Sequence, residues 1–99
     1  MGLMSLGIAS ARSYDILLSD PSMVGTTQLH AGEYKLKVEG SDAVFTDVQN
    51  QQTFKAPVKV ENGKQKFDET RVESTKNGEM AHISSIDLAG STTKLEFGR

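Results

Sequence analysis

Apolar and polar residues alternate along most of this chain, and the clearest alternation covers residues 29–40. Tyr34, Leu36 and Val38 occupy every second position, with charged residues between them. A period of two places the apolar side chains on one face of a strand and the charged side chains on the other. This stretch therefore predicts a strand with one buried face, and we expect the rest of the domain to be built around it.

The same alternation, interrupted by turn residues, predicts further strands on both sides of this one. They cover residues 13–19, 23–30, 43–47, 53–61, 66–75, 80–88 and 92–97. No segment keeps a helical period for more than about two turns. We therefore predict an all-β fold, an antiparallel Greek-key β-sandwich of seven or eight strands.

Two Asn-Gly dipeptides mark predicted hairpin turns. Asn62-Gly63 lies between two alternating runs, and Asn77-Gly78 precedes the run that begins at Met80. Asn and Gly both tolerate the positive φ that two-residue hairpin loops require. The sequence therefore predicts a hairpin at each dipeptide.

Three places break the regular alternation. Pro57 predicts that its strand lies at a sheet edge or contains a bulge, because proline has no N–H to donate, and we expect Val60 of the same run to point inward. The inward parity changes within residues 67–72 and again near residues 84–85. A bulge or a change of face is expected at both.

Leu29, Gly32 and Tyr34 have the spacing of a tyrosine corner, which is a fold feature of Greek-key sandwiches. In such a corner, a Tyr at the start of a strand turns its hydroxyl back onto the backbone just upstream. The bond contributes about 1 kcal/mol to stability. We expect these three residues to form one corner of the sandwich.

The segment 29–40, LHAGEYKLKVEG, resembles the L-x-A-G-x-Y-x-L-x-V-x-G segment of prealbumin-like and carboxypeptidase-regulatory-like domains, which are Ig-like sandwiches found in exported bacterial proteins. The whole chain is similar to small exported proteins of soil bacteria that carry no assigned activity. The resemblance implies a bacterial protein that is secreted or periplasmic, at the cell exterior. It implies a fold rather than a catalytic site.

Length and charge narrow the class of protein. With 99 residues, the chain suffices for one domain with one modest core. Its net charge is −2, and the two signs are interleaved, so nucleic acid is not an expected partner. The absence of cysteine excludes disulfides, thiolate catalysis and cysteine metal sites.

Residues 1–11 form an apolar leader that we separate from a single sandwich domain over residues 12–99. Ala9-Ser10-Ala11 has the form of a signal-peptidase site, and the apolar run is shorter than the ~20 residues that a membrane-spanning helix needs. Met4, Leu6 and Ile8 alternate with small residues. The leader is thus expected to be either the remnant of an export signal or a strand that pairs with a partner.

The residues that could carry chemistry are few. His30 and His82 are the only histidines, and no serine lies in a G-x-S-x-G motif. Asp42 and Asp47 lack the spacing of a calcium loop, so turn capping and solvation are expected of them. We expect no enzymatic activity, no cofactor and no metal.

Two functions fit these observations. In the first, the protein is a non-catalytic exported module that binds itself or another protein, with Met4, Leu6 and Ile8 donated as a strand to a neighbour's sheet edge. Head-to-tail repetition of that contact would build filaments. In the second, it is a monomeric sandwich that binds a carbohydrate or another small ligand through loops at one end, of which residues 48–52 are the first candidate.

Overall fold

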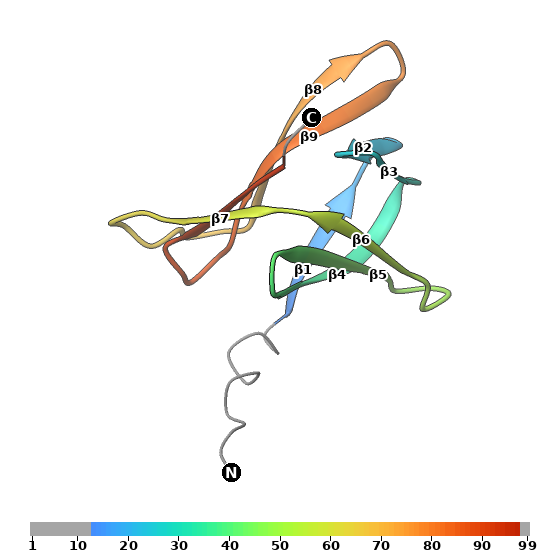
Figure 1. Cartoon of the computed structure of the whole chain (residues 1–99). Coiled ribbons are helices and arrows are strands. Elements are labelled where there is room, and N and C mark those ends of the chain that lie inside the picture. Colours follow the sequence, from blue (N-terminus) through green and yellow to red (C-terminus); the bar gives the residue numbers. More distant parts are fainter. Residues whose placement is uncertain (1–12, 98–99) are drawn as a thin grey trace.

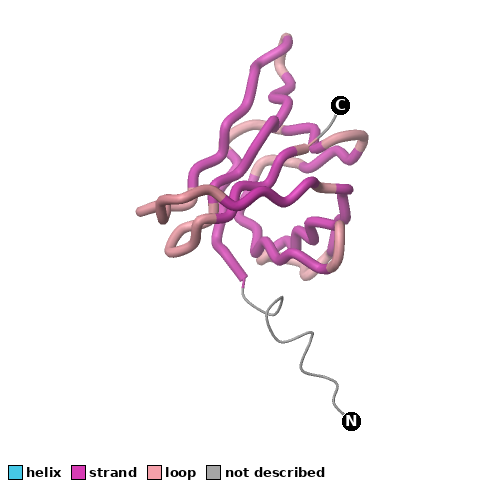
Figure 2. The backbone as a smooth tube through the Cα atoms, turned by 60° about the vertical axis from the view of Figure 1, so that its left-hand side comes forward, coloured by secondary structure: helices cyan, strands magenta, loops and turns pink. Residues whose placement is uncertain are grey.

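The computed structural model describes residues 13–97, and in that range the chain consists of ten strands joined by turns and loops (Figures 1 and 2). The strands are β1 (Ser13–Leu18), β2 (Ser22–Val24), β3 (Thr27–Leu29), β4 (Gly32–Glu39), β5 (Asp42–Asp47), β6 (Thr53–Pro57), β7 (Lys59–Asn62), β8 (Arg71–Asn77), β9 (Met80–Asp87) and β10 (Thr93–Glu96).

These strands form two sheets. One contains β1, β4, β5 and β6 in that order, and the other contains β3, β2, β9, β10 and β7 in that order, with β8 paired to β9. The buried side chains of both sheets belong to one apolar cluster, so the predicted all-β fold with two layers is confirmed. One pair, β2 with β9, is parallel, whereas the prediction was antiparallel throughout.

Strand β9 is paired along both of its edges. β8 follows it along one edge, and the other edge is divided between β2, which pairs with Ala81 and His82, and β10, which pairs with residues 85–87. The turn of the β8–β9 hairpin projects beyond the neighbouring strands (Figures 1 and 2). Two separate strand pairs, β2 with β3 and β10 with β7, therefore join the sheet along one edge of β9.

Two predicted strands are each divided into two. Residues 23–30 form β2 and β3, which pair around Gly25 at φ 64°. Residues 53–61 form β6 in one sheet and β7 in the other, and β6 is an edge strand, as Pro57 predicted. Val60 lies opposite the buried Leu95 but is itself 41% exposed, because β7 is also an edge strand. Val60 therefore shares the core-facing side of its sheet with Leu95, as predicted, but lies beyond the part that the core covers.

The hairpin predicted at Asn62-Gly63 is also wrong. β7 pairs with β10, and the N–H of Gly63 donates to the carbonyl of Thr92 at 2.8 Å. The following residues form a connection with an isolated bridge at Phe67, and β8 begins only at Arg71. Pairing with a strand that comes 30 residues later has displaced the local hairpin that the dipeptide favours.

The irregularity predicted near residues 84–85 is a β-bulge. The pairing between β8 and β9 skips Ser84, which is the extra residue of β9. One inserted residue reverses the alternation of faces. For this reason Ile83 and Ile86, which have opposite parity, are both buried.

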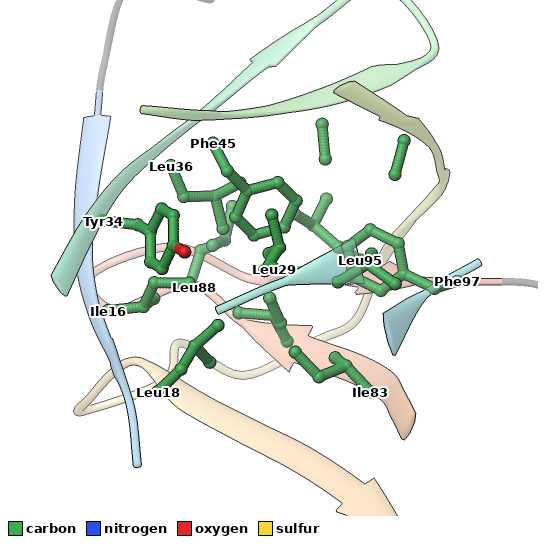
Figure 3. Packing of buried hydrophobic residues seen from close by; sticks show 14 residues of the cluster. Ile16, Leu18, Leu29, Tyr34, Leu36, Phe45, Ile83, Leu88, Leu95 and Phe97 are labelled. Atoms are coloured by element: carbon green, nitrogen blue, oxygen red, sulfur yellow. The ribbon is translucent and has the colours of Figure 1, made fainter. Parts of the chain in front are cut away.

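The core lies between the two sheets, and Tyr34 of β4 is one of its fully buried members (Figure 3). The Tyr34 ring meets Phe45 and Phe54 edge-on, with ring centroids 6.4 and 6.3 Å apart. Edge-to-face aromatic pairs contribute about 0.5–1.5 kcal/mol beyond the burial of their area. The other largest fully buried side chains are Leu29, Leu36, Ile86, Leu95 and Val24.

The two Asn-Gly dipeptides provide a matched test of this fold. Gly78 has a φ of 73° in the β8–β9 turn, whereas Gly63 is not at positive φ and a Cβ there would meet only Thr92 O, at 3.8 Å. We predict that Gly78→Ala lowers the free energy of unfolding by about 1 kcal/mol or more, and that Gly63→Ala changes it by about 0.5 kcal/mol or less. Urea unfolding of both variants measures this. Equal losses in the two would contradict the assigned turns.

Candidate functional site

The tyrosine corner joins β3 to β4. The Tyr34 hydroxyl donates to the carbonyl oxygen of His30 at 2.7 Å, and Leu29 and Tyr34 are both fully buried. Gly32 has a φ of 149°, which a residue with a side chain rarely adopts. The hydroxyl therefore has its partner within the corner, as a buried phenol requires.

The imidazole of His30 lies between two acceptors. Its Nδ1 is 2.8 Å from the carbonyl oxygen of Ala31, and its Nε2 is 2.7 Å from Oδ2 of Asp47. A carbonyl and a carboxylate can only accept, so the arrangement favours the protonated form of the imidazole. The bond to Ala31 is the main cause that raises the pKa of His30 above 6.5; Asp47 adds to it, and desolvation opposes it.

Asp47 links this corner to the loop between β5 and β6. The sequence placed it among solvated turn residues, but its side chain is only 4% exposed. Oδ1 accepts the N–H of Gln49 at 2.8 Å, which is the capping that was expected, while Oδ2 lies 2.7 Å from Nε2 of His30 and has no aligned hydrogen bond. The bond from Gln49 is the main cause that lowers the pKa of Asp47 below 3.8, and His30 contributes in the same direction.

The His30–Asp47 contact has the partners of a catalytic dyad but not the geometry of one. A general base needs a free ring nitrogen directed at a nucleophile, and here Asp47 and Ala31 engage both nitrogens. His82, the other histidine, is exposed on β9. Within residues 13–97, no group of three or more His, Asp or Glu side chains is placed to hold a metal ion. The contact therefore positions the corner and the loop.

The loop at residues 48–52, the first candidate for ligand binding, is closed by its own hydrogen bonds. Asp47 and Gln52 are joined through backbone groups at 2.8 Å, and the N–H of Gln52 also donates to the side chain of Asn50 at 2.9 Å. Val48 donates its N–H to Glu33 of β4 at 3.1 Å. These bonds use backbone groups that a ligand would otherwise contact.

One long side of the molecule is open. In residues 13–97, β1 pairs with β4 and β8 pairs with β9, and neither pairs with a second strand of this range. A hollow of about 160 Å³ lies between them, lined by Leu17, Leu18, Ser19, Asp20, Ser22, Val72, Ser74, Ala81 and Ile83. Three serines and Asp20 line this hollow together with the apolar side chains. We call the surface formed by β1, β8 and the hollow between them the open side.

The exposed face of β1 carries the largest uncovered apolar residue of the described chain. Leu17 is 71% exposed, whereas its neighbours Ile16 and Leu18 point into the core (Figure 3). The charge next to it, on Asp15, is paired with Lys35 of the same sheet at 2.6 Å. The sequence already contained this signal, because Leu17 falls with Asp15 on the polar face of its strand.

The other edges are better protected. The hydroxyl of Thr27 on β3 donates to the carbonyl of Lys55 on β6 at 2.9 Å, which covers the edge that contains Pro57. β7 carries the pair Lys59–Glu61 at 3.5 Å. Charged and proline-containing edges discourage pairing with another chain. β1 also carries a charge pair, but it presents Leu17, which is 71% exposed, at its surface.

A second hollow, of about 430 Å³, lies where β2 and the end of β10 approach β9. Met23, Ile83 and Phe97 form its apolar lining, and Thr75, His82 and Ser84 form its polar lining, with Gly25 at the rim. The volume falls within the range of small-molecule pockets, about 300–1,000 Å³. The sequence gave no sign of this hollow, because it exists only where the two strand pairs meet beside the bulge.

Met4, Leu6 and Ile8, the residues expected to bind a partner, lie outside the described residues. The corner residues Leu29 and Tyr34 contribute to the core rather than to a surface. Within residues 13–97, no helix has the length and apolar character needed to cross a membrane. The open side and the hollow of about 430 Å³ are candidate functional surfaces of the described residues.

The His30–Asp47 contact makes stability depend on pH in two windows. Since the folded pKa of His30 is raised, its contribution is complete below pH 6.5 and is lost as pH rises through the folded pKa. Since that of Asp47 is lowered, its contribution is present above pH 3.8 and is lost as pH falls through the folded pKa.

We predict that the urea midpoint of the wild-type protein falls between about pH 6 and pH 8, and that His30→Gln removes this fall. His82→Gln, which replaces the exposed histidine, is the control and should keep the wild-type profile. Parallel pH profiles for the wild type and His30→Gln would show that the imidazole does not contribute to stability through Asp47.

Comparison with known proteins identifies no relative of this chain. No protein-family model, curated protein or solved structure matches this chain. The function is therefore inferred from the geometry of the described residues and from the chemistry of the sequence alone.

Proposed function

We propose that this protein is a non-catalytic β-sandwich module that associates with itself or with another protein by strand addition at its open side. The observation that carries the proposal is Leu17, which is 71% exposed on β1 and lies beside a hollow lined by both polar and apolar side chains. An added strand gains main-chain hydrogen bonds along a sheet edge, and pockets beside it select alternate side chains.

The leader supplies a candidate for the added strand. Met4, Leu6 and Ile8 alternate with small residues, so an extended leader presents three apolar side chains on one face. Chain contacts repeated head to tail build filaments, whereas a reciprocal contact closes at two copies. Filaments and closed dimers are both consistent with the proposal, and they differ in their symmetry.

We also propose a more specific fold and a cellular location for this protein. The corner at Tyr34 and the motif in residues 29–40 support an Ig-like or prealbumin-like Greek-key domain. The Ala9-Ser10-Ala11 sequence supports export to the periplasm or the cell exterior. Residues 12–99 would then form a bacterial structural or binding module outside the cytoplasm.

A charge on either face of the leader tests the proposal in the full-length chain. We predict that Leu6→Asp abolishes association, because it places a carboxylate on the inserted apolar face, and that Ser5→Asp, on the opposite face, retains most of it. Light scattering and negative-stain microscopy over a range of protein concentrations measure assembly. Assembly that is unchanged by Leu6→Asp would exclude the leader as the donated strand.

The larger hollow favours a second candidate, a monomeric sandwich that binds a carbohydrate or a small apolar ligand. Its lining residues carry no acidic or lysine or arginine side chain, so the ligand class is uncharged. We predict that a neutral monosaccharide or phenol shifts the NMR amide signals of Thr75 and His82, and that His82→Ala weakens the response. Glu69→Gln, at an exposed site outside this hollow, is the control. Unshifted spectra at millimolar probe would exclude this candidate.

A further inference from the structure

We propose that Asn77 is a site of spontaneous covalent modification, at which the side-chain amide is lost as ammonia and the main chain isomerises. Asparagine is among the thermolabile residues, and a following glycine, which has no Cβ, leaves the attacking backbone nitrogen unhindered. The chain contains this dipeptide twice, at Asn62-Gly63 and at Asn77-Gly78. The local sequence makes the two sites alike, whereas the structure makes them different. The modification does not depend on the proposed association.

The reaction needs two groups and one water molecule. Base removes the proton from the N–H of Gly78, and this nitrogen attacks Cγ of Asn77. The new C–N bond closes a cyclic imide, while the bond from Cγ to the side-chain nitrogen breaks and that nitrogen leaves as ammonia. Water then adds to either carbonyl of the imide, and the ring opens to Asp or to isoaspartate. The backbone nitrogen must therefore be free to lose its proton, and the side-chain amide must be free to turn toward it.

The turn between β8 and β9 leaves both groups free. Within residues 13–97, the N–H of Gly78 is bonded to no acceptor and the side chain of Asn77 to no partner. Both residues are exposed. A Cβ built on Gly78, whose φ is 73°, would meet no atom within 4 Å outside its two chain neighbours. The space in which the imide forms is therefore open.

Asn77 also lies at the end of its hairpin. It forms the last pair of β8 with β9, opposite Met80. The turn projects beyond the neighbouring strands (Figures 1 and 2). Local opening at such an end costs far less free energy than opening in the core. Ring closure at Asn77 therefore disturbs the end of one hairpin and leaves the core packed.

The same two groups are held in place at Asn62. The N–H of Gly63 donates to the carbonyl of Thr92 at 2.8 Å, and Oδ1 of Asn62 accepts the hydroxyl of Thr93 at 3.0 Å. Both bonds must open before the nitrogen of Gly63 can attack. The pairing of β7 with β10, which displaces a local hairpin here, therefore also protects this asparagine.

Peptide mapping of the full-length protein, incubated in mildly alkaline buffers, tests the proposal. Trypsin places the two asparagines in different peptides, because it cleaves after Lys64 and after Lys76. We expect Asn77 to lose its amide roughly tenfold faster than Asn62 in the folded protein, since two hydrogen bonds protect Asn62. The rate at Asn77 should rise with pH, because the attacking nitrogen must first lose its proton. Mass spectrometry of the two peptides measures both rates.

A matched variant and an unfolded control complete the experiment. Loss of the amide adds one carboxylate, so the net charge of −2 becomes −3 and isoelectric focusing resolves the product. Asn77→Gln keeps an amide but closes the ring far more slowly, and this acidic species should disappear. Thr93→Val removes the hydroxyl that bonds Asn62 and should speed the loss there. In urea, the rates at the two asparagines should become similar.

Each outcome decides the proposal. Faster loss at Asn77 in the folded protein, together with similar rates in urea, supports it. Equal rates in the folded protein, or a faster loss at Asn62, would show that the hydrogen bonds of β7 and β10 do not select the site. A folded protein that keeps the amide of Asn77 overturns the proposal, whatever the unfolded chain does.

Discussion

The arrangement of this protein depends on one buried tyrosine whose hydroxyl must be satisfied. A buried phenol without a partner is costly, and Tyr34 avoids that cost by donating to the backbone of His30. The ring of His30 is in turn held by Asp47, which also caps the loop after β5. The side chain of Tyr34 reaches Phe45 and Phe54 on β5 and β6. A single residue thus connects the corner, the core and a distant loop.

The chain crosses between the sheets on both long sides of the sandwich. On one side it passes from β6 to β7 after Pro57, and the hydroxyl of Thr27 donates to the carbonyl of Lys55 there. On the other side it passes from β1 to β2, and Asp20 in this connection lies 3.7 Å from Lys76 of β8. Leu17 stays 71% exposed beside this second crossing, and this exposure is the physical basis for placing association there.

Predictions from local pattern succeeded where the local preference and the long-range pairing agree. The alternation around Leu36 became β4, and the parity change near Ser84 became a bulge. They failed where the two disagree. Asn77-Gly78 forms a hairpin turn, while the same dipeptide at Asn62-Gly63 does not, because β7 finds its partner in β10 rather than in the residues that follow it. A two-residue signal contains no information about a strand that comes 30 residues later.

The sequence by itself determined that this protein is all-β, which faces of most strands are buried, and that a Tyr-Gly corner begins β4, because these follow from side chains a few positions apart. Only the tertiary structure decided that His30 meets Asp47, since the pairing of β4 with β5 brings residues 17 positions apart into contact. The hollow between β1 and β8 and the hollow beside the bulge of β9 were likewise decided by strand order. Strand order is set by the packing of the whole core, and alternation along one strand is compatible with many orders.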